Sequence, residues 1–236
     1  MKESLSIVLP IFNEVKSLEH VVSNWSKFLN KNNILHEFVI CEDGSTDGTK
    51  ELIINLKSRY PISDQSAQYR RGYGGGVIAG IIASKYEYIL CIDSDGQCMP
   101  DSFLDFYKNK HLADILIGNR NPRKDPIIRI IYSKLFKIIH NYLFNSRIKD
   151  PSCPYVLGKK KMYLKLLNKL EYLREGFWWG FVGAAKMLGF KFNQIDIVHY
   201  KRFDGSTVVY KLSKMPAIII RNIIGLIKLK KSFDLK

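Results

Sequence analysis

Two carboxylates that fall within a single turn are the residues of this sequence with the clearest chemistry. Asp93 and Asp95 follow the apolar run 89–92, and Gln97 comes next in the same turn. Two carboxylates at the end of a buried strand repel each other, so we expect a cation beside them. Mg²⁺ and Mn²⁺ take oxygen ligands, and Mg²⁺ commonly bridges one or two carboxylates to substrate phosphates. The triplet is common by chance, and it gains weight only from its strand and its neighbours.

Two further polar clusters also follow apolar runs. Glu14 stands shortly after the run 5–12, and Asp43 lies in the segment 42–49, which reads Glu-Asp-Gly-Ser-Thr-Asp-Gly-Thr. Phe12 offers a flat ring on which a nucleobase could stack, while Glu14 and Asp43 could accept hydrogen bonds from a base or a ribose. Either cluster alone could equally be an ordinary turn, because Asp, Gly, Ser and Asn are favoured in turns for backbone reasons.

The pattern around these residues predicts the elements that position them. From residue 5 to about 120, short apolar runs alternate with segments of helical period, which is typical of βα units on a mostly parallel sheet. The expected strands cover 5–12, 37–41, 88–92 and 114–117, and the expected helices begin near residues 15, 47, 74 and 100. Ligands bind beyond the carboxyl ends of the strands in such sheets, so we expect the three polar clusters to form one site.

The composition fits one globular domain with an anionic partner. The chain has 236 residues, 46% of them hydrophobic, and 37 Lys and Arg against 22 Asp and Glu, which gives a formal net charge of +15. Nucleic acid, a phosphorylated substrate and acidic lipid would all match this charge. Nucleic acid is disfavoured because the cations are spread along the chain and are not gathered in a patch interleaved with exposed aromatic residues.

The cysteines and the first residues of the chain indicate a reducing compartment. Cys41, Cys91, Cys98 and Cys153 show no C-x-x-C spacing, and two of them lie in strand-like apolar runs, so all four are expected to be reduced core residues. A strand-like run starts at residue 5, which leaves no room for the apolar core of a signal peptide. A cytoplasmic location is the resulting expectation.

Two later helices bear on membrane contact. Residues 127–144 predict a helix with apolar residues nearly all round, and residues 215–230 combine Ile and Leu with Arg221, Lys228 and Lys230. The second composition suits an amphipathic helix at the surface of an anionic membrane, although ordinary core packing is an alternative for both helices. No stretch reaches the roughly 18 to 20 apolar residues that a spanning helix needs, so peripheral attachment is the prediction.

Taken together, these segments resemble family 2 glycosyltransferases, which have the GT-A fold and carry P-x-[YF]-N-E, [DE]-D-G-S-x-D-G-T and D-x-D motifs. All three motifs occur here, in the segments 10–14, 42–49 and 93–95. A narrower resemblance to the polyprenyl-phosphate sugar transferases rests on segments later in the chain: 70–76, 118–120, 129–133, 148–153 and 199–206. The resemblance covers about residues 5–206. It implies a Rossmann-like α/β domain, a mostly parallel sheet flanked by helices, with an amphipathic C-terminal helical extension.

The resemblance also implies a role for each matching residue. The nucleotide-sugar site would be formed by Pro10, Phe12, Glu14, Asp43, Ser45, Gly72, Asp93 and Ser94. The metal, Mg²⁺ or Mn²⁺, would be held by Asp93, Asp95 and Gln97. The acceptor phosphate would be held by Arg129, Ser133 and Arg202, and the residues assigned to catalysis are Asp95, Arg120, Arg129 and Arg202. Guanidinium groups match phosphate oxygens in a way that a lysine does not. Arg123 and Arg147, by contrast, are expected to be solvated surface charges.

The activity implied by the resemblance is the inverting, metal-dependent transfer of a sugar from a UDP- or GDP-linked donor to a polyprenyl phosphate. The transfer would take place at the cytoplasmic face of an anionic membrane, where an integral-membrane partner is also expected. Residues 1–206 would form the catalytic domain, with a nucleotide-sugar half (1–120) and an acceptor half (121–206). Residues 207–236 would form a basic amphipathic tail.

The chain departs from the family pattern at two places. Glu42 stands where Asp is common, and Gly180 and Phe181 stand where an acidic residue often follows the aromatic residues. A sugar hydroxyl as acceptor would need a base, whereas a lipid monophosphate, with a second pKa of about 6, is already anionic. Two alternatives remain open: transfer to a saccharide hydroxyl in cell-surface polysaccharide synthesis, and a catalytically silent nucleotide-sugar-binding protein. The intact D-x-D segment argues against the second.

Overall fold

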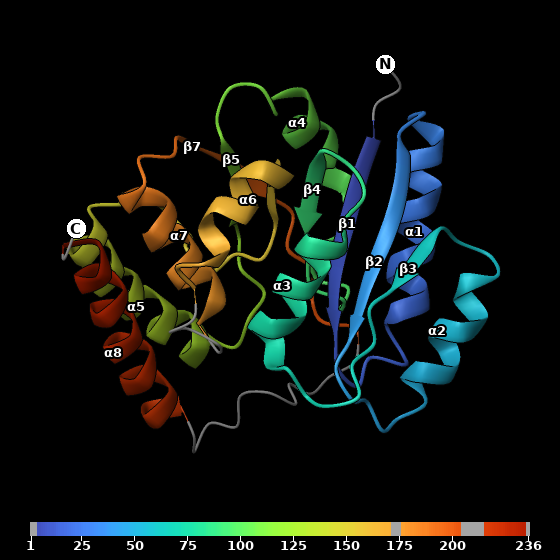
Figure 1. Cartoon of the computed structure of the whole chain (residues 1–236), viewed down its shortest axis with the longest axis horizontal. Helices are drawn as coiled ribbons and strands as arrows, with labels where there is room; N and C mark the ends of the chain where they lie inside the picture. The colour runs from blue at the N-terminus through green and yellow to red at the C-terminus, as the bar shows by residue number, and fades with distance from the viewer. Residues whose placement is uncertain (1–3, 171–175, 204–214, 235–236) are drawn as a thin grey trace.

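A single seven-stranded sheet forms the centre of the computed structural model, which describes residues 4–170, 176–203 and 215–234 (Figure 1). The strand order is β3-β2-β1-β4-β6-β5-β7. The strands are β1 (Ser4–Ile11), β2 (Leu35–Glu42), β3 (Ile62–Asp64), β4 (Tyr88–Cys91), β5 (Ile115–Arg120), β6 (Val156–Lys159) and β7 (Phe192–Ile197). Six strands run in one direction, and β6 alone is antiparallel to its neighbours β4 and β5. The predicted mostly parallel α/β sheet is therefore confirmed.

Helices cover both faces of this sheet (Figure 1). They are α1 (Leu18–Lys31), α2 (Thr49–Lys57), α3 (Gly72–Ala83), the short η1 (Pro100–Ser102) with α4 (Phe103–Lys108), α5 (Ile127–Phe144), α6 (Lys160–Leu167), α7 (Phe177–Met187) and α8 (Met215–Asp234). On one face, α3 packs on β1 and β2 and contacts α6, which contacts α7. On the other face, α1 packs on β2, and its Trp25 ring contacts the ring of Phe103 from α4.

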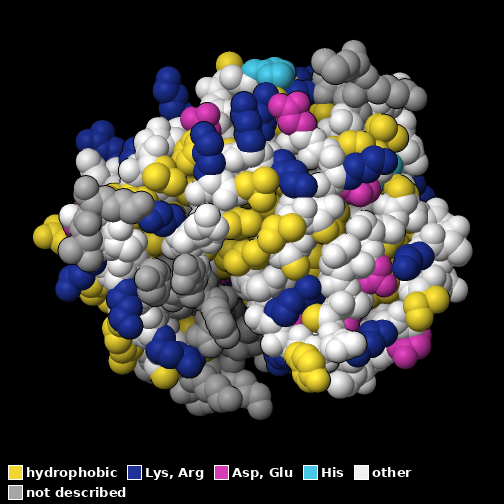
Figure 2. Space-filling view, in the orientation of Figure 1, with side chains coloured by type: hydrophobic (Ala, Val, Ile, Leu, Met, Phe, Trp, Pro, Cys, Tyr) yellow, Lys and Arg dark blue, Asp and Glu magenta, His cyan; other side chains and the backbone are white. Residues whose placement is uncertain are grey.

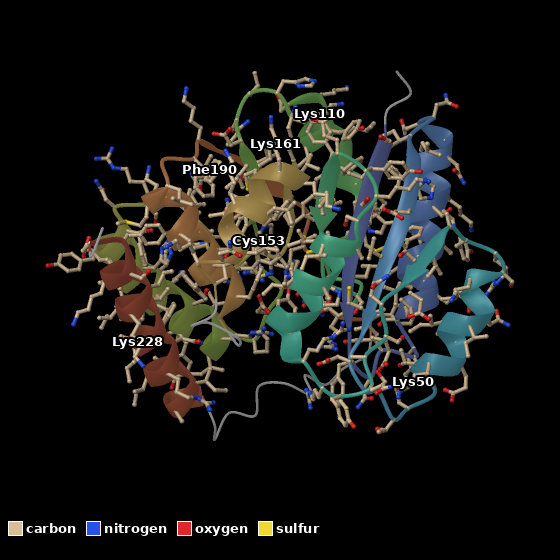
Figure 3. The ribbon with its side chains drawn as sticks, viewed as in Figure 1. Lys50, Lys110, Cys153, Lys161, Phe190 and Lys228 are labelled. Carbon is tan, nitrogen blue, oxygen red and sulfur yellow. The ribbon has the colours of Figure 1, made fainter. Side chains whose placement is uncertain are left out.

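The central strands are apolar on both faces because both faces are covered. All of β4 and most of β1 and β2 are buried, as expected of parallel strands between helical layers. Close packing also depends on Gly80 of α3, where an added Cβ would lie 2.5 Å from Val8 Cγ1 and 2.7 Å from Cys41 Sγ. The four cysteines are free and buried, as predicted, and Figure 3 shows Cys153 in the interior of the molecule.

The side of the sheet on which the chain adds its next strand changes between β1 and β4. The chain adds β2 and β3 on one side of β1 and then adds β4 on the other side, so the connections after β1 and β4 leave in opposite directions. A crevice forms at such a switch point, beyond the carboxyl ends of the strands. The segments after β1 and β4 begin at residues 12 and 92, so the sheet topology places two of the three polar clusters at this point.

Three helices form a separate group beside the β5–β7 side of the sheet. In Figure 1, α5 and α8 run side by side, and both begin on the side toward which β1, β2 and β4 point. Both helices contact α7, and α8 contributes Leu226 and Leu229 to the main core. Within the described ranges, no helix is long and apolar enough to span a membrane. The sheet continues from β4 into β6, across the predicted boundary at residue 120, and the division into halves and tail stays a prediction.

Candidate active site

The turns after β1, β2 and β4 meet at one edge of the sheet. Asp43 donates its backbone N–H to the carbonyl of Ile11 (3.0 Å), which ties the turn after β2 to the end of β1. The Ser94 hydroxyl donates to the carbonyl of Pro10 (3.0 Å) and ties the turn after β4 to the same strand. Gly96 has a φ of 79°, a left-handed conformation that glycine adopts without steric cost. The chain can therefore turn sharply after the second carboxylate of the D-x-D segment.

Asp95 is buried at this edge, and Asp93 is half-buried. Burial raises the pKa of Asp93 to about 7, and the charge of Asp95 adds to the rise. Burial also raises the pKa of Asp95, although the hydrogen bond from the N–H of Gln97 (3.0 Å) opposes this effect. Each carboxylate is therefore costly to ionise in the absence of a neighbouring cation.

This pair fits a hard divalent cation. A cation between the two carboxylates would offset their burial and their mutual repulsion, and their oxygens are the ligand type that Mg²⁺ and Mn²⁺ prefer. In the described parts of the chain, no group of three or more His, Cys, Asp or Glu has the geometry of a metal site. Mg²⁺ usually takes only one or two protein carboxylates and completes its coordination with phosphate and water oxygens. The assignment of the metal to Asp93 and Asp95 remains a prediction that these features support.

Two side chains from separate helices hold Asp93 in place. The Tyr73 hydroxyl, on α3, donates to Asp93 Oδ1 (2.7 Å), and the indole N–H of Trp178, on α7, donates to that hydroxyl (2.7 Å). Burial and the neighbouring Asp93 raise the pKa of Tyr73 well above its usual value, so the phenol stays protonated and remains a donor. Neither residue could be given a role from the sequence, because no sequence pattern brings α3 and α7 together.

Asp43, which was predicted to contact the nucleoside, is engaged by the start of α3. Its two carboxylate oxygens accept the backbone N–H groups of Arg71 (2.5 Å) and Gly72 (2.8 Å). Ser45 joins two of the turns, since its hydroxyl accepts the N–H of Asn13 (2.9 Å). These contacts fix the shape of the crevice wall, and the roles of Asp43, Ser45 and Gly72 in nucleotide binding stay predictions.

The ring of Phe12 is covered by a cation. The guanidinium carbon of Arg70 lies 3.7 Å from the ring centroid, and Arg70 Nε lies 3.9 Å from Asp43 Oδ2. The Arg70 side chain is 56% exposed, so it can leave the ring without disrupting the core. Stacking of a nucleobase on Phe12, which is still a prediction, requires this movement.

Arg202 connects the clusters after β1 and β4. Its Nη2 hydrogen bonds to Glu14 Oε1, and its Nη1 lies 3.9 Å from Asp95 Oδ2. Burial raises the pKa of Glu14, while the hydroxyl of Ser17 (2.7 Å) and the charge of Arg202 act against that rise. A guanidinium thus lies between two carboxylates that were predicted to contact the donor and the metal.

The segment 199–203 lies on the D-x-D turn. The backbone N–H of Phe203 donates to the carbonyl of Asp95 (3.2 Å), and the N–H of Tyr200 donates to the carbonyl of Gln97 (3.0 Å). The side-chain amide of Gln97 donates to the carbonyl of Tyr200 (3.2 Å), so Gln97 as a metal ligand stays a prediction. Residues 204–206 of the predicted motif lie outside the described residues.

A chain of ion pairs runs beside this turn, in the order Arg129, Asp125, Arg123, Asp150, Arg120. Arg129 Nη1 lies 3.3 Å from Asp125 Oδ1, and Arg123 Nη2 lies 2.7 Å from Asp125 Oδ2. Arg123 Nη1 lies 3.8 Å from Asp150 Oδ1, and Arg120 Nε lies 2.7 Å from Asp150 Oδ2. Burial alone would raise the pKa of Asp150, but Arg120 outweighs it and holds this pKa at about 2.

These ion pairs correct the expectation for Arg123 and bear on the residues predicted for the acceptor phosphate. Arg123 was expected to be a solvated surface charge, but its side chain is only 15% exposed and pairs with two carboxylates. Arg147 is exposed, as expected. Ser133 accepts a hydrogen bond from Arg123 Nη1 (2.8 Å), and the charges of Arg129 and Arg202 both lower the pKa of Asp95. The role of Arg129, Ser133 and Arg202 at the acceptor phosphate stays a prediction.

His199 is a buried imidazole next to these arginines. It is 3% exposed, and its Nδ1 accepts the backbone N–H of Lys124 (3.0 Å). Burial and the positive charge of Arg120 lower the pKa of His199 to about 4. The neutral imidazole therefore joins the loop before α5 to the segment that lies on the D-x-D turn.

Comparison with known proteins links the chain to sugar transfer. The model of the family described as Glycosyl transferase family 2 matches residues 6–170. Dolichyl-phosphate beta-glucosyltransferase of Dictyostelium discoideum is 26% identical over 255 residues, a match that covers 96% of this chain and 77% of the relative. Dolichyl-phosphate beta-glucosyltransferase ALG5A of Trichomonas vaginalis is 27% identical over 227 residues, covering 89% of this chain and 69% of the relative.

A solved structure shows the same fold. Glucosyl-3-phosphoglycerate synthase from Mycobacterium tuberculosis, in complex with Mn²⁺, UDP and phosphoglyceric acid, superposes with a TM-score of 0.70. The match covers 97% of this chain and 78% of that chain, at 18% sequence identity. The predicted GT-A fold is therefore confirmed.

Tyr73→Phe should lower the free energy of unfolding by about 1–3 kcal/mol, because it leaves the buried indole N–H of Trp178 and the Asp93 carboxylate without a partner. Urea unfolding would measure this as a lower midpoint with an unchanged slope. Tyr69→Phe is the matched control, because the Tyr69 side chain is 83% exposed. Equal midpoints for the two variants would contradict the role given to the Tyr73 hydroxyl.

His199→Asn should make the protein less sensitive to acid. The unfolded imidazole binds a proton below its ordinary pKa of about 6.5, whereas the folded one does so only below about 4. Acid therefore favours unfolding of the wild type between these values, and Asn keeps an acceptor for the N–H of Lys124 without titrating. The stability difference should shift toward the variant by up to about 1.4 kcal/mol per pH unit in this window. Urea unfolding from pH 7 to pH 4 would measure it, and parallel curves would contradict the assignment.

Proposed function

Because the chain belongs to glycosyl transferase family 2, we propose that it transfers a sugar from a nucleotide-sugar to a polyprenyl phosphate at a membrane surface. Glycosyltransferase activity follows from the family match over residues 6–170. The finer assignment comprises a UDP- or GDP-linked donor, Mg²⁺ or Mn²⁺, inversion at the anomeric carbon and a lipid phosphate acceptor. Contacts at the sheet edge and the names of the relatives support it.

One observation carries the choice of acceptor: each described carboxylate beside the D-x-D turn already has a partner. Glu14, Asp125 and Asp150 pair with arginines. Asp43 and Glu42 accept backbone N–H groups, and the second oxygen of Glu42, which has no partner, is fully buried and out of reach of an acceptor. Among the residues with described positions, the edge therefore offers no free base to take a proton from a sugar hydroxyl. A phosphate acceptor needs no such base, since it is already anionic near neutral pH.

In the proposed reaction, a phosphate oxygen of the acceptor attacks the anomeric carbon of the sugar. The bond from that carbon to the nucleoside diphosphate breaks, and the configuration inverts. Arg129 and Arg202 hold the acceptor phosphate and offset its charge, and the Ser133 hydroxyl contributes a hydrogen bond. Arg120 acts through Asp150, which it fixes, and so keeps Arg123 and Asp125 in place. A divalent cation at Asp93 and Asp95 would stabilise the charge of the departing diphosphate.

The relatives suggest which donor and cation to test first. Both curated relatives are named dolichyl-phosphate beta-glucosyltransferases, and the structural neighbour was solved with Mn²⁺ and UDP. We therefore infer UDP-glucose and Mn²⁺ as the first pair. The buried positions of Gly180 and Phe181 agree with an acceptor that needs no carboxylate base there.

The outward faces of α5 and α8 support attachment to a membrane. On α5, Phe136, His140 and Phe144 point into the protein, while the opposite face is apolar and exposed. This exposed face consists of Ile127 (77%), Ile131 (48%), Leu135 (55%), Ile138 (64%) and Tyr142 (87%). On α8 the exposed apolar residues are Ile220 (58%), Ile224 (47%) and Ile227 (38%). Each helix thus packs against the protein on one side and leaves apolar side chains exposed on the other.

Charge selects an anionic membrane as the occupant of these faces. The α5 sequence contains Arg129, Lys134 and Lys137 and no acidic residue. In α8, Asp234 is the single acidic residue among 20, and Lys228 extends from this helix in Figure 3. Over the face shown in Figure 2, Lys and Arg outnumber Asp and Glu. Aliphatic side chains bordered by cations match the interface of an anionic bilayer.

Release of UDP from UDP-glucose with Mn²⁺ should be stimulated by polyprenyl phosphate. Asp95→Asn should lower kcat/KM by more than about 100-fold, since even residues behind the metal ligands contribute 10- to 100-fold. Asp105→Asn, at an exposed carboxylate on α4, is the control and should behave as wild type. A discontinuous UDP assay with and without lipid measures both effects.

The outcomes of this assay separate the two acceptor classes. Metal-dependent release that is indifferent to polyprenyl phosphate would favour a saccharide hydroxyl as acceptor. Normal turnover by Asp95→Asn would exclude the D-x-D segment as the cation site.

Ile131→Gln with Ile138→Gln should release the protein from anionic liposomes. Inserting one isoleucine is worth on the order of 1 kcal/mol or more, so the pair should weaken binding by at least about ten-fold. Sedimentation with the liposomes measures the bound fraction. Ile54→Gln, at a 70% exposed position on α2, is the control and should bind as wild type. Equal binding by all three proteins would remove α5 from the membrane contact.

A further inference from the structure

The hydroxyl of Tyr73 engages one oxygen of a carboxylate in the proposed cation site. It comes from α3, outside the D-x-D segment, and donates to Asp93 Oδ1 over 2.7 Å. Its own oxygen accepts the indole N–H of Trp178 (2.7 Å). An indole nitrogen can only donate, so the single phenol hydrogen is directed to Asp93. Together the two hydrogen bonds fix the direction in which the phenol donates.

Two separate parts of the fold hold this phenol in place. The backbone N–H of Gly72, the residue before Tyr73, donates to Asp43 Oδ2 (2.8 Å), which ties the start of α3 to the turn after β2. Trp178 is 5% exposed, and its ring packs edge-on against that of Phe181, with centroids 5.4 Å apart. The donor that Asp93 meets is therefore a fixed part of the structure.

The second carboxylate of the pair shows the same pattern. Asp95 Oδ1 accepts the backbone N–H of Gln97 (3.0 Å), whereas Asp95 Oδ2 lies 3.9 Å from Arg202 Nη1, beyond hydrogen-bond distance. Among the residues that the structure describes, none forms a hydrogen bond with Asp93 Oδ2, since the bond to Asp93 is made at Oδ1. Each carboxylate thus has one oxygen held by a protein donor and one oxygen without such a donor.

This pattern limits the way in which a cation can bind. With one oxygen of each carboxylate already held, Asp93 and Asp95 would each offer a single oxygen. Mg²⁺ suits such a site, because it requires near-octahedral coordination and takes only one or two carboxylates, with phosphate and water oxygens as its other ligands. Ca²⁺ takes about six to eight oxygens in flexible sites, where a carboxylate often binds through both of its oxygens. The site therefore offers Ca²⁺ fewer oxygens and less freedom than it favours.

We propose that Tyr73 is a positioning residue that determines the choice of cation. By leaving Asp93 one free oxygen, it favours Mg²⁺ or Mn²⁺ over Ca²⁺, and Trp178 contributes by fixing the phenol. The inference rests on the cation site of the proposed function and deepens it, since both residues act through Asp93. A cation that binds few protein oxygens keeps most of its coordination positions for the diphosphate, whose departure it would assist.

The cation affinity of the full chain tests this proposal without the transfer reaction. Electron paramagnetic resonance measures free Mn²⁺ in the presence of UDP, and competition with Ca²⁺ gives the second dissociation constant. Tyr73→Phe should weaken Mn²⁺ binding by about 10- to 100-fold, as is typical when the hydrogen-bond partner of a ligand is removed. Ca²⁺ binding should weaken much less, because Asp93 then offers both oxygens. The ratio of the Ca²⁺ to the Mn²⁺ dissociation constant should therefore fall.

Tyr163→Phe is the matched control for the loss of a buried phenol. The Tyr163 hydroxyl is also buried and donates over 2.8 Å, but it does so to the backbone carbonyl of Val156. This variant should lose similar stability and keep the wild-type ratio. Trp178→Phe is a second variant that retains the Tyr73 phenol and removes the indole N–H, so its ratio should move in the same direction as that of Tyr73→Phe.

The outcomes separate this inference from the cation site on which it rests. A wild-type ratio in both Tyr73→Phe and Trp178→Phe would overturn the inference, because a purely structural role would weaken the binding of both cations equally. Mn²⁺ binding that is absent in the wild type, or that persists in Asp95→Asn, would instead overturn the cation site itself. Loss of Mn²⁺ binding in Asp95→Asn together with an unchanged ratio in Tyr73→Phe would reject the inference alone.

Discussion

The repulsion between two carboxylates at the end of β4 is the constraint on which the rest of the site depends. Burial and mutual repulsion raise the pKa of Asp93 to about 7, so this end of the strand is costly to form by itself. Elements that are far apart in the sequence offset this cost. Tyr73 of α3 donates to Asp93, Trp178 of α7 holds Tyr73, and Arg202 brings a positive charge to Asp95. The proposed cation site would thus be complete only when α3, α7 and the segment 199–203 are packed around it.

The arginines beside this pair are also charged groups in a buried position, and they depend on carboxylate partners. Arg120 and Asp150 have side-chain exposures of only 8% and 5%, and a buried charge without its partner would be strongly destabilising. Asp150 therefore fixes Arg120 and approaches Arg123, which in turn holds Asp125 against Arg129. The orientation of Arg129, which is proposed to hold the acceptor phosphate, is consequently set by residues further along this network. Much of the excess positive charge remains on lysines outside this network, where it is free to meet an anionic partner.

Local sequence patterns predicted the fold and the turns of the site well, but they did not predict the long-range contacts. The strands β1, β2, β4 and β5 and the helix α5 lie within a few residues of their predicted bounds, because their apolar periodicity is strong. β6 was missed, since an antiparallel strand of four residues has no βα signal around it. Asp93 and Asp95 are only two positions apart in the sequence and could be identified directly. Tyr73 could not, because its role exists only through contacts with two other elements.

One helix connects the two functions proposed for this chain. Arg129 and Ser133 lie on the inner side of α5, and Ile131, Leu135 and Ile138 lie on its outer side. The exposed face extends from Ile127 to Tyr142, which at about 1.5 Å per residue is roughly 22 Å, and only one side of the helix is apolar. Such a helix suits a position along a bilayer surface and not across it. The acceptor-phosphate residues would then lie about one helix diameter from the lipid, within reach of a phosphate whose polyprenyl chain stays in the membrane.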